Sequence, residues 1–277
     1  MLKRTITGAV ITAVSVGFIF LREFVDVKLF DILIYFMALV ATFELTRAFN
    51  GKINGFQKIA AFLFTAAIIP IAVFWKRGLW QVYIAYAAVL CFSSLFIKDE
   101  SLESIGYSLV TLVYPTLPLT LLTIINDTYG GLSLYVIIVI FTVASFTDVF
   151  AYLVGSLLKG KKLCPAISPN KTISGAIGGL LGGIAASVLT YVLLNAINYE
   201  FTLGISSTPL LVLFMVLSGA VLSAADELGD LVESFIKRKT GIKDMGTLFP
   251  GHGGMLDRID GLSFVTLFSF VIFSFLA

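Results

Sequence analysis

The stretch YVIIVIFTVASF, residues 135–146, decides the fold because it is almost continuously apolar. A lipid-facing β-strand alternates polar and apolar residues, whereas a helix that crosses a bilayer needs about 20 mostly apolar residues in a row. A helix also satisfies its backbone hydrogen bonds within one segment, which the hydrocarbon interior of a bilayer requires. The stretch therefore predicts a transmembrane helix.

Similar apolar runs recur along the chain. Of its 277 residues, 58% are hydrophobic and 13% are charged, whereas soluble globular chains carry about 25% charged residues. The basic and apolar N-terminus resembles a signal peptide but lacks a small-residue cleavage site, so we interpret it as a retained first helix. We predict an all-α, polytopic membrane protein with about nine transmembrane helices, near residues 5–22, 28–47, 57–75, 79–97, 104–126, 131–158, 173–197, 207–235 and 261–277.

The distribution of basic residues predicts the orientation. With nine spans and the N-terminus inside, four of the 19 Lys and Arg residues face outward and the other fifteen face the cytoplasm. Loops rich in Lys and Arg stay on the cytoplasmic side of a membrane. We therefore expect a multi-pass protein of the inner, cytoplasmic membrane, with its N-terminus and its polar site on the cytoplasmic side.

The chain divides by composition into two regions. Residues 1–130 have few charges within the predicted spans and are predicted to be a transmembrane scaffold, whereas residues 131–277 hold intramembrane charges, basic loops and many glycines and are predicted to be the catalytic region. Pro115 and Pro118 should bend the fifth span. Three glycines four residues apart predict close packing of one helix face: Gly175, Gly179 and Gly183.

The segment SAADELGDLVESFIKR, residues 223–238, places three carboxylates at helical spacing. Asp226, Asp230 and Glu233 follow one another at i, i+4 and i+7, so they share one helix face. One Asp at the centre of a membrane helix costs about 2.5–3.5 kcal/mol, and carboxylate oxygens are the ligands that Mg²⁺ prefers. We predict that Asp226 and Asp230 bind Mg²⁺, with a second cation left open. For Glu233, an exposed ion pair with Lys237 is an equal alternative.

The segment GIKDMGTLFPGHGGMLDRIDG, residues 241–261, combines glycines with charge. Asp257 and Asp260 are three residues apart and share a helix face, so they can complete the metal site. Gly253 and Gly254 allow a ligand to approach the backbone closely. His252 is a general base, a hydrogen-bond donor to phosphate or a structural residue, and the sequence does not choose among these.

The basic residues around this segment suit a phosphorylated substrate. Arg binds phosphate through a bidentate fork and Lys binds it as a point charge. The alternative is contact with anionic lipid headgroups. The residues are Lys237, Arg238, Lys243 and Arg258.

A third polar stretch precedes residue 173. Asp148 lies inside the predicted span 131–158, and SPNKT at residues 168–172 offers hydroxyls and a cation before a helix N-terminus, where backbone amides attract anions. An ordinary helix cap is the alternative for this motif. GSLLKGKK, residues 155–162, is not a P-loop, because Lys162 stands in place of Ser or Thr and no strand precedes it.

The stretch SFIKRKTGIKDMGTLFPGHGGMLDRID, residues 234–260, resembles the signature of phosphatidate cytidylyltransferases, also called CDP-diacylglycerol synthases. The resemblance extends to Asp148 and to SPNKT, although Asn170, Ile173 and Ser174 depart from the usual motif. It implies that CTP and phosphatidic acid react to give CDP-diacylglycerol and pyrophosphate, with Mg²⁺ as cofactor. A transporter and a CTP-dependent lipid kinase remain as alternatives.

Taken with this resemblance, the residues form three predicted sets. We expect CTP and phosphatidic acid as partners, no nucleic acid, and leave a homodimer open. The catalytic set is Asp230, Lys237, Arg238, Lys243, Asp244, His252 and Arg258; the CTP-binding set is Ser168, Lys171, Thr172, Gly253 and Gly254; the metal set is Asp148, Asp226, Asp230, Asp257 and Asp260.

Overall fold

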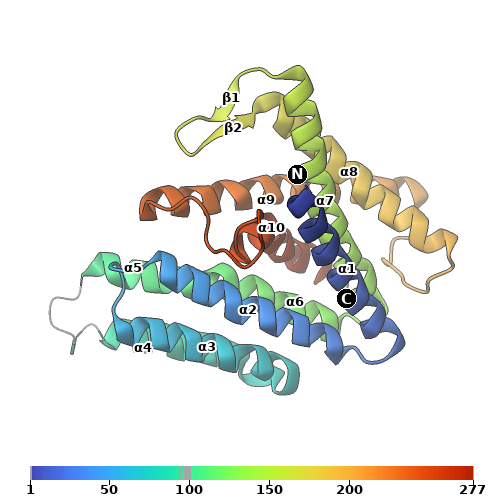
Figure 1. Cartoon of the computed structure of the whole chain (residues 1–277). Helices are drawn as coiled ribbons and strands as arrows, with labels where there is room; N and C mark the ends of the chain where they lie inside the picture. The colour runs from blue at the N-terminus through green and yellow to red at the C-terminus, as the bar shows by residue number, and fades with distance from the viewer. Residues whose placement is uncertain (1, 94, 97–100, 277) are drawn as a thin grey trace. The chain divides into compact units, whose positions relative to one another are not determined.

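A computed structural model describes residues 2–93, 95–96 and 101–276 of the chain (Figure 1). Helices dominate, as predicted, and two short strands form a hairpin. The elements are α1 (Leu2–Phe24), α2 (Lys28–Ala48), α3 (Gly55–Phe74), α4 (Leu79–Ser93), α5 (Leu102–Thr111), α6 (Leu117–Thr128), α7 (Leu132–Leu158), β1 (Lys162–Cys164), β2 (Ser168–Thr172), α8 (Ile173–Ala196), α9 (Thr208–Thr240) and α10 (Leu256–Phe273).

Within the described residues, seven segments are long and apolar enough to cross a membrane: Ile6–Phe24, Lys28–Ala48, Gly55–Phe74, Leu102–Thr128, Leu132–Leu158, Ile173–Ala196 and Thr208–Thr240. The chain is therefore a multi-pass membrane protein. Two further predicted spans coincide with shorter helices, since α4 has 15 residues and α10 has 18 with three charges near its start. Residues 94, 97 and 277 of these two predicted spans lie outside the described residues. Lys98, one of the fifteen basic residues expected on the cytoplasmic side, does as well.

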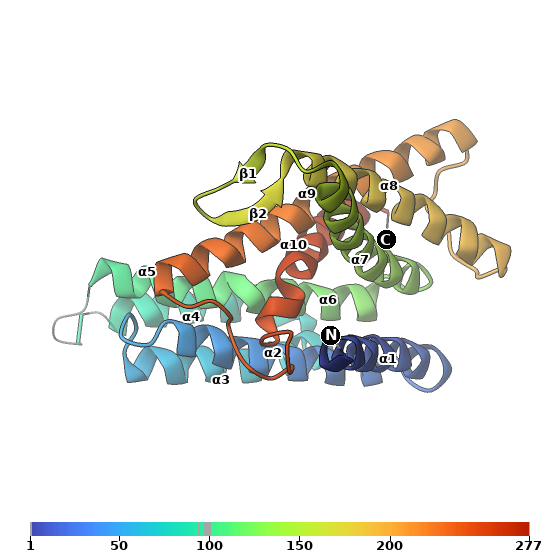
Figure 2. The ribbon, with the colours of Figure 1, turned by 45° about the horizontal axis from the view of Figure 1, so that its top comes forward.

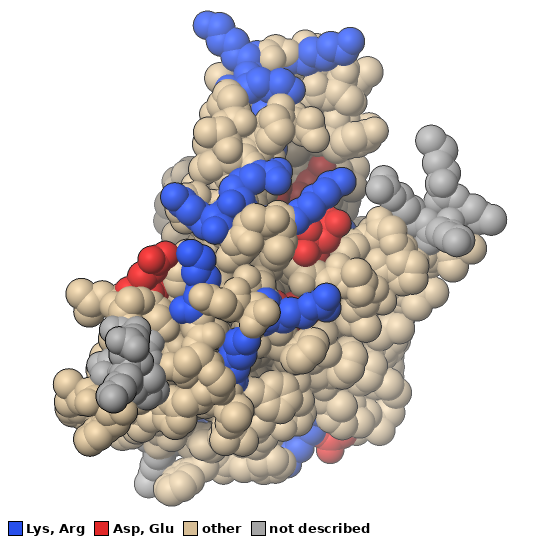
Figure 3. Space-filling model, turned by 60° about the vertical axis from the view of Figure 1, so that its left-hand side comes forward, with Lys and Arg blue, Asp and Glu red and all other residues tan. Residues whose placement is uncertain are grey.

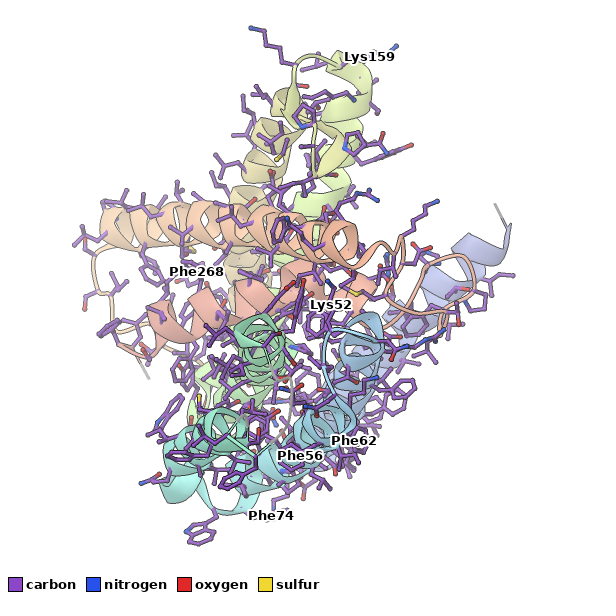
Figure 4. The ribbon with its side chains drawn as sticks, turned by 90° about the vertical axis from the view of Figure 1, so that its left-hand side faces the viewer. Lys52, Phe56, Phe62, Phe74, Lys159 and Phe268 are labelled. Atoms are coloured by element: carbon purple, nitrogen blue, oxygen red, sulfur yellow. The ribbon has the colours of Figure 1, made fainter. Side chains whose placement is uncertain are left out.

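The first compact unit consists of Met1–Asp127 and Thr240–Arg258. A chain of hydroxyls links three of its elements, with 3.0 Å between Thr42 Oγ1 and Thr65 Oγ1 and 3.1 Å between Thr65 Oγ1 and Thr116 Oγ1. These contacts pair polar groups that would otherwise be unsatisfied within an apolar environment. Helix α3 also carries exposed phenylalanines (Figure 4): Phe56, Phe62 and Phe74. Exposed apolar side chains of this kind suit a lipid-facing surface.

The predicted bend in the fifth span is confirmed. A π-helical stretch, Leu112–Thr116, separates α5 from α6, and Tyr114 within it has the extended angles φ −136° and ψ 123°. Pro115 lacks a backbone N–H and its ring clashes with the preceding turn, so a regular α-helix cannot continue through it. The interruption lies within the first unit, where neighbouring helices cover it.

The second compact unit consists of Thr128–Lys239 and Ile259–Ala277. Helices α7 and α8 pack closely in it (Figure 2). A Cβ on Gly175 would lie 2.9 Å from the Ala151 carbonyl oxygen, and one on Gly183 would lie 2.5 Å from Ser223 Cβ. The packing role predicted for the glycine stripe is therefore confirmed. The first unit ends near the predicted boundary at residue 130, but it also includes residues 240–258. The predicted division into a scaffold and a catalytic region remains a prediction.

The hairpin is an addition to the predicted all-α fold. Strands β1 and β2 pair antiparallel, and α8 follows β2 directly. Thr172 Oγ1 accepts a hydrogen bond of 3.1 Å from the Gly175 amide, so Thr172 is the N-cap of α8. Lys and Arg side chains project from the hairpin end of this unit (Figure 3), and Lys159 extends from the end of α7 (Figure 4). The hairpin thus carries basic side chains beyond the apolar helices.

Candidate functional site

Six carboxylates of the second unit gather around the C-terminal half of α9. Oxygens of Asp230, Glu233 and Asp260 all lie within 4.8 Å of one another. Asp226 is 2% exposed and lies within electrostatic range of Asp148, Asp230 and Asp260. We define the carboxylate cluster as Asp148, Asp226, Glu227, Asp230, Glu233 and Asp260.

Two glycines bring α9 and α10 close enough to assemble this cluster. A Cβ on Gly229 would lie 2.6 Å from the Asp260 carbonyl oxygen and 2.9 Å from the Gly261 Cα. A Cβ on Gly261 would overlap the Asp226 carboxylate. With no side chain between them, the two helix backbones meet, and Asp260 lies beside the carboxylates of α9. Helix packing therefore completes a set that neither helix could form alone.

Two lysines partly neutralise the cluster. Lys171 Nζ lies 2.7 Å from Asp230 Oδ2 and donates to the Glu227 carbonyl oxygen at 3.3 Å. Lys237 forms an ion pair with Glu233 one turn earlier on α9. This pair is the one that the sequence allowed, but the Glu233 side chain is 0% exposed rather than at a solvated helix end. Glu233 is thus part of the buried cluster.

The cluster suits a divalent cation. Its donors are carboxylate oxygens, which Mg²⁺ prefers to nitrogen or sulfur. Six carboxylates face two ammonium groups, so the formal charge with all groups ionised is −4. Buried like charges at such spacing repel one another strongly, and a bound cation would relieve this repulsion. The residues present therefore fit Mg²⁺.

The hairpin places further predicted residues in the second unit. Ser168 lies at the start of β2, and Lys171 reaches from the same strand into the carboxylate cluster. The exposed Arg238 donates from Nε to the Ile167 carbonyl oxygen at 3.3 Å. Thr172 has the capping role that the sequence left as an alternative. The structure brings Lys171 to the carboxylates; roles in binding CTP for Ser168, Lys171 and Thr172 remain predictions.

The first unit holds the signature loop, which we define as residues 241–256. Gly251 and Gly253 adopt φ values of +79° and +81°, a region that favours glycine. The Phe249 amide donates to the Gly253 carbonyl oxygen, and the His252 amide donates to the Phe249 carbonyl oxygen, both at 2.8 Å. These bonds fold residues 249–253 into a tight turn. The glycines of the motif therefore shape the backbone.

Asp257 holds the two ends of this loop together. Its Oδ2 accepts hydrogen bonds of 2.8 Å from the amides of Met245 and Gly254, and the residue is 7% exposed. A carboxylate that accepts two amide bonds in a buried setting fixes the backbone strongly. Loop organisation is a role for Asp257 that we did not predict. The metal-binding role of Asp257 remains a prediction. The three carboxylates whose oxygens lie within 4.8 Å of one another are Asp230, Glu233 and Asp260.

The remaining predicted residues lie in or next to the loop. Lys243, Asp244 and Arg258 are exposed, and their catalytic roles remain predictions. His252 is half-buried, and its Nδ1 has no hydrogen-bond partner among the described residues. The structure does not choose among the three interpretations of His252.

Sequence reasoning missed Glu44 of the first unit, and it left Glu227 and Glu233 of the second unit undecided. Glu44, in α2, accepts hydrogen bonds from the amides of Met255 and Leu256. Its isolation in an apolar stretch was the available signal, because an ionisable residue within a membrane helix is a functional candidate by default. Glu233 was weighed as an exposed pair, and only its complete burial places it in the cluster.

Comparison with known proteins covers nearly the whole chain. The profile of the cytidylyltransferase family matches residues 2–276. A phosphatidate cytidylyltransferase of Bacillus subtilis (strain 168) is 33% identical over 273 residues, which span 95% of this chain and 96% of the relative. One of Rickettsia bellii (strain RML369-C) is 31% identical over 76% of this chain and 87% of its own length. One of Brucella abortus (strain 2308) is 45% identical over 46% of this chain and 42% of its own length.

Proposed function

Since the chain belongs to the cytidylyltransferase family, we propose that it is a phosphatidate cytidylyltransferase, which converts CTP and phosphatidic acid to CDP-diacylglycerol and pyrophosphate. The observation that carries this proposal is the carboxylate cluster, held with two lysines at the polar end of lipid-facing helices. A reaction between a nucleotide and a lipid phosphate requires such a combination, because both reactants are polyanions and one of them stays in the bilayer.

The chemistry requires charge neutralisation rather than a strong base. The nucleophile is a phosphate monoester, whose second pKa near 6 leaves its oxygens largely ionised at pH 7. One of these oxygens forms a bond to the α-phosphorus of CTP, while the bond from that phosphorus to the bridging oxygen of the β-phosphate breaks and pyrophosphate leaves. The barrier comes from repulsion between anions, which positioned cations lower.

We assign the metal to the carboxylate cluster. Asp226, Asp230 and Asp260 would hold Mg²⁺, with Asp148 and Glu233 beside them, and Asp257 remains in the predicted set. When bound, Mg²⁺ neutralises and orients the phosphate oxygens of CTP. Lys171 Nζ lies 2.7 Å from Asp230 Oδ2, and we assign Lys171 to hold that carboxylate in place.

We assign the other predicted residues to phosphate. Arg and Lys side chains bind phosphate oxygens by charge-assisted hydrogen bonds, and glycine amides allow phosphate to approach the backbone. His252 would serve as a hydrogen-bond donor rather than as a base, since the nucleophile is already ionised. The assigned residues are Ser168, Thr172, Lys237, Arg238, Lys243, His252, Gly253, Gly254 and Arg258. Asp244 is an anion and does not bind phosphate, so it stays in the predicted catalytic set with no phosphate contact assigned.

A test with CTP labelled at two positions distinguishes this reaction from its nearest alternative. We expect purified protein in detergent to transfer label from α-³²P CTP, but not from γ-³²P CTP, to lipid when phosphatidic acid and Mg²⁺ are present. Chelation with EDTA should stop the transfer, and added Mg²⁺ should restore it. Transfer of the γ-label to an isoprenoid alcohol would instead establish a lipid kinase, and no labelled lipid from folded protein would contradict both activities.

We also propose nine spans, with the N-terminus and the active site facing the cytoplasm of a bacterial inner membrane. Helix α4, with 15 residues, is about 22 Å long at 1.5 Å per residue, which is shorter than a hydrocarbon core of about 30 Å. Local thinning of the bilayer or snorkelling of flanking side chains accommodates a short helix at modest cost. If α4 crosses, six spans separate the N-terminus from the hairpin, so both lie on the same side.

Cysteine labelling tests this topology. In a background with Cys91→Ser and Cys164→Ser, we expect a membrane-impermeant maleimide to label Ser206→Cys from outside intact spheroplasts. Lys161→Cys, in the hairpin, should react only in inverted vesicles, because it faces the cytoplasm. Labelling of Lys161→Cys in intact spheroplasts would show that α4 does not cross or that the orientation is reversed. Both positions are exposed in the structure.

A further inference from the structure

Glu44 is a buried acidic residue of α2, a largely apolar helix of the predicted scaffold. It lies near the C-terminal end of α2 and is 5% exposed. Burying a carboxylate is costly unless its oxygens are hydrogen-bonded. The partners of Glu44 therefore indicate why the residue is tolerated.

Both oxygens of Glu44 bind the start of α10, more than 200 residues later in the chain. The Met255 amide donates to Oε1 at 3.0 Å, and the Leu256 amide donates to Oε2 at 2.9 Å. The first amides of a helix have no partner within the helix and carry partial positive charge. Glu44 thus caps α10 from a different helix, with each oxygen holding one amide.

The glycines of the signature loop make room for this carboxylate. A Cβ added to Gly246 or to Gly254 would overlap the Glu44 side chain. The two glycines also lie close together, because a Cβ on Gly246 would be 3.0 Å from the Gly254 Cα. Glu44 therefore lies against both limbs of the loop. All of these contacts lie within the first compact unit.

Glu44 and Asp257 act on neighbouring amides. Asp257 Oδ2 binds the amides of Met245 and Gly254, and Glu44 binds the next two amides along the chain. Three successive backbone N–H groups, from Gly254 to Leu256, are thereby held by two buried carboxylates. These amides join the turn that contains His252 to α10, whose first turn contains Asp257 and Arg258.

We propose that Glu44 is a positioning residue, which fixes the signature loop so that the loop can bind the phosphates of CTP. It acts through the backbone of residues 254–256 and does not itself contact substrate. The link to CTP rests on the proposed function. The scaffold half of the chain therefore supplies one of the two carboxylates that set the geometry of the loop.

Replacing Glu44 by Gln tests the proposal, because Gln keeps the shape but presents an NH₂ group to one of the two amides. We expect faster hydrogen–deuterium exchange at residues 244–257 and unchanged exchange in α7 and α8. We also expect the KM for CTP to rise about tenfold or more, as loss of a buried, charge-assisted hydrogen bond predicts. Glu44→Asp, which retains the charge but is one methylene shorter, should give intermediate values.

The control is Glu103→Gln in the same unit, because the Glu103 side chain is 68% exposed and pairs with Lys52 at 3.7 Å. It should leave the exchange and the KM unchanged. A Glu44→Gln or Glu44→Asp protein with a lower Vmax but a wild-type KM for CTP would overturn the proposal, since KM does not depend on the folded fraction. If the Glu44→Gln protein does not fold, the KM for CTP of the Glu44→Asp protein tests the proposal instead. Absence of cytidylyl transfer by the wild type would refute the proposed function, while the exchange measurement would still test the effect of Glu44 on the loop.

Discussion

Replacement of Asp230 by Asn should lower the rate of CDP-diacylglycerol formation by about 10²–10³-fold, the range found when one group that stabilises transition-state charge is removed. Asp230 lies at the centre of the carboxylate cluster, within 4.8 Å of Glu233 and Asp260 and 2.7 Å from Lys171 Nζ. Asn preserves the size of the side chain but removes its charge. Both the proposed metal and Lys171 would lose a partner.

The measurement is the initial rate with α-labelled CTP over a range of Mg²⁺ concentrations, with the elution profile in detergent as a check on folding. Higher Mg²⁺ should recover part of the activity, because the remaining carboxylates still attract the ion. Glu200→Gln provides the control, since Glu200 is an exposed residue of the same unit outside the cluster. A folded Asp230→Asn protein with a near wild-type rate would exclude Asp230 from the catalytic set.

Replacement of Gly229 by Ala should also abolish most of the activity, although Gly229 carries no functional group. Its added Cβ would lie 2.6 Å from the Asp260 carbonyl oxygen and 2.9 Å from the Gly261 Cα. Both neighbours are backbone atoms, so α9 and α10 must separate. Overpacking of this kind costs about 1–3 kcal/mol, and the separation moves Asp260 away from Asp230.

We expect a lower melting temperature and a loss of activity of about tenfold or more, since a displacement of about 1 Å in a catalytic constellation can cost up to about 100-fold. Gly106→Ala in α5 is the matched control, because no atom lies within 4 Å of its added Cβ. It should retain wild-type activity and be slightly stabilised, as a Gly to Ala change inside a helix predicts. Equal behaviour of the two variants would show that the contact between α9 and α10 does not set the geometry of the cluster.

The membrane architecture could be predicted from local sequence because the bilayer imposes a local requirement. Each spanning segment must be apolar and must satisfy its own backbone, so runs such as residues 135–146 identify helices without knowledge of their neighbours. Helical spacing likewise places Asp226, Asp230 and Glu233 on one face. The glycine stripe and the bend at Pro115 follow from equally local rules, and the structure confirms both.

The partners of these residues depend on tertiary packing. Asp260 joins the cluster because Gly229 and Gly261 let two helix backbones meet, and no pattern within either helix specifies which glycines face each other. Glu44 binds amides 211 and 212 residues away, so nothing near it in the sequence indicates its partner. The hairpin of β1 and β2 and the burial of Glu233 also depend on contacts that the local sequence does not specify. Composition and periodicity therefore predicted the helices and a shared face for the carboxylates of α9. The folded chain decided which carboxylates belong to the cluster and which hold the loop, because hydrogen bonds and close helix contacts form between residues distant in sequence.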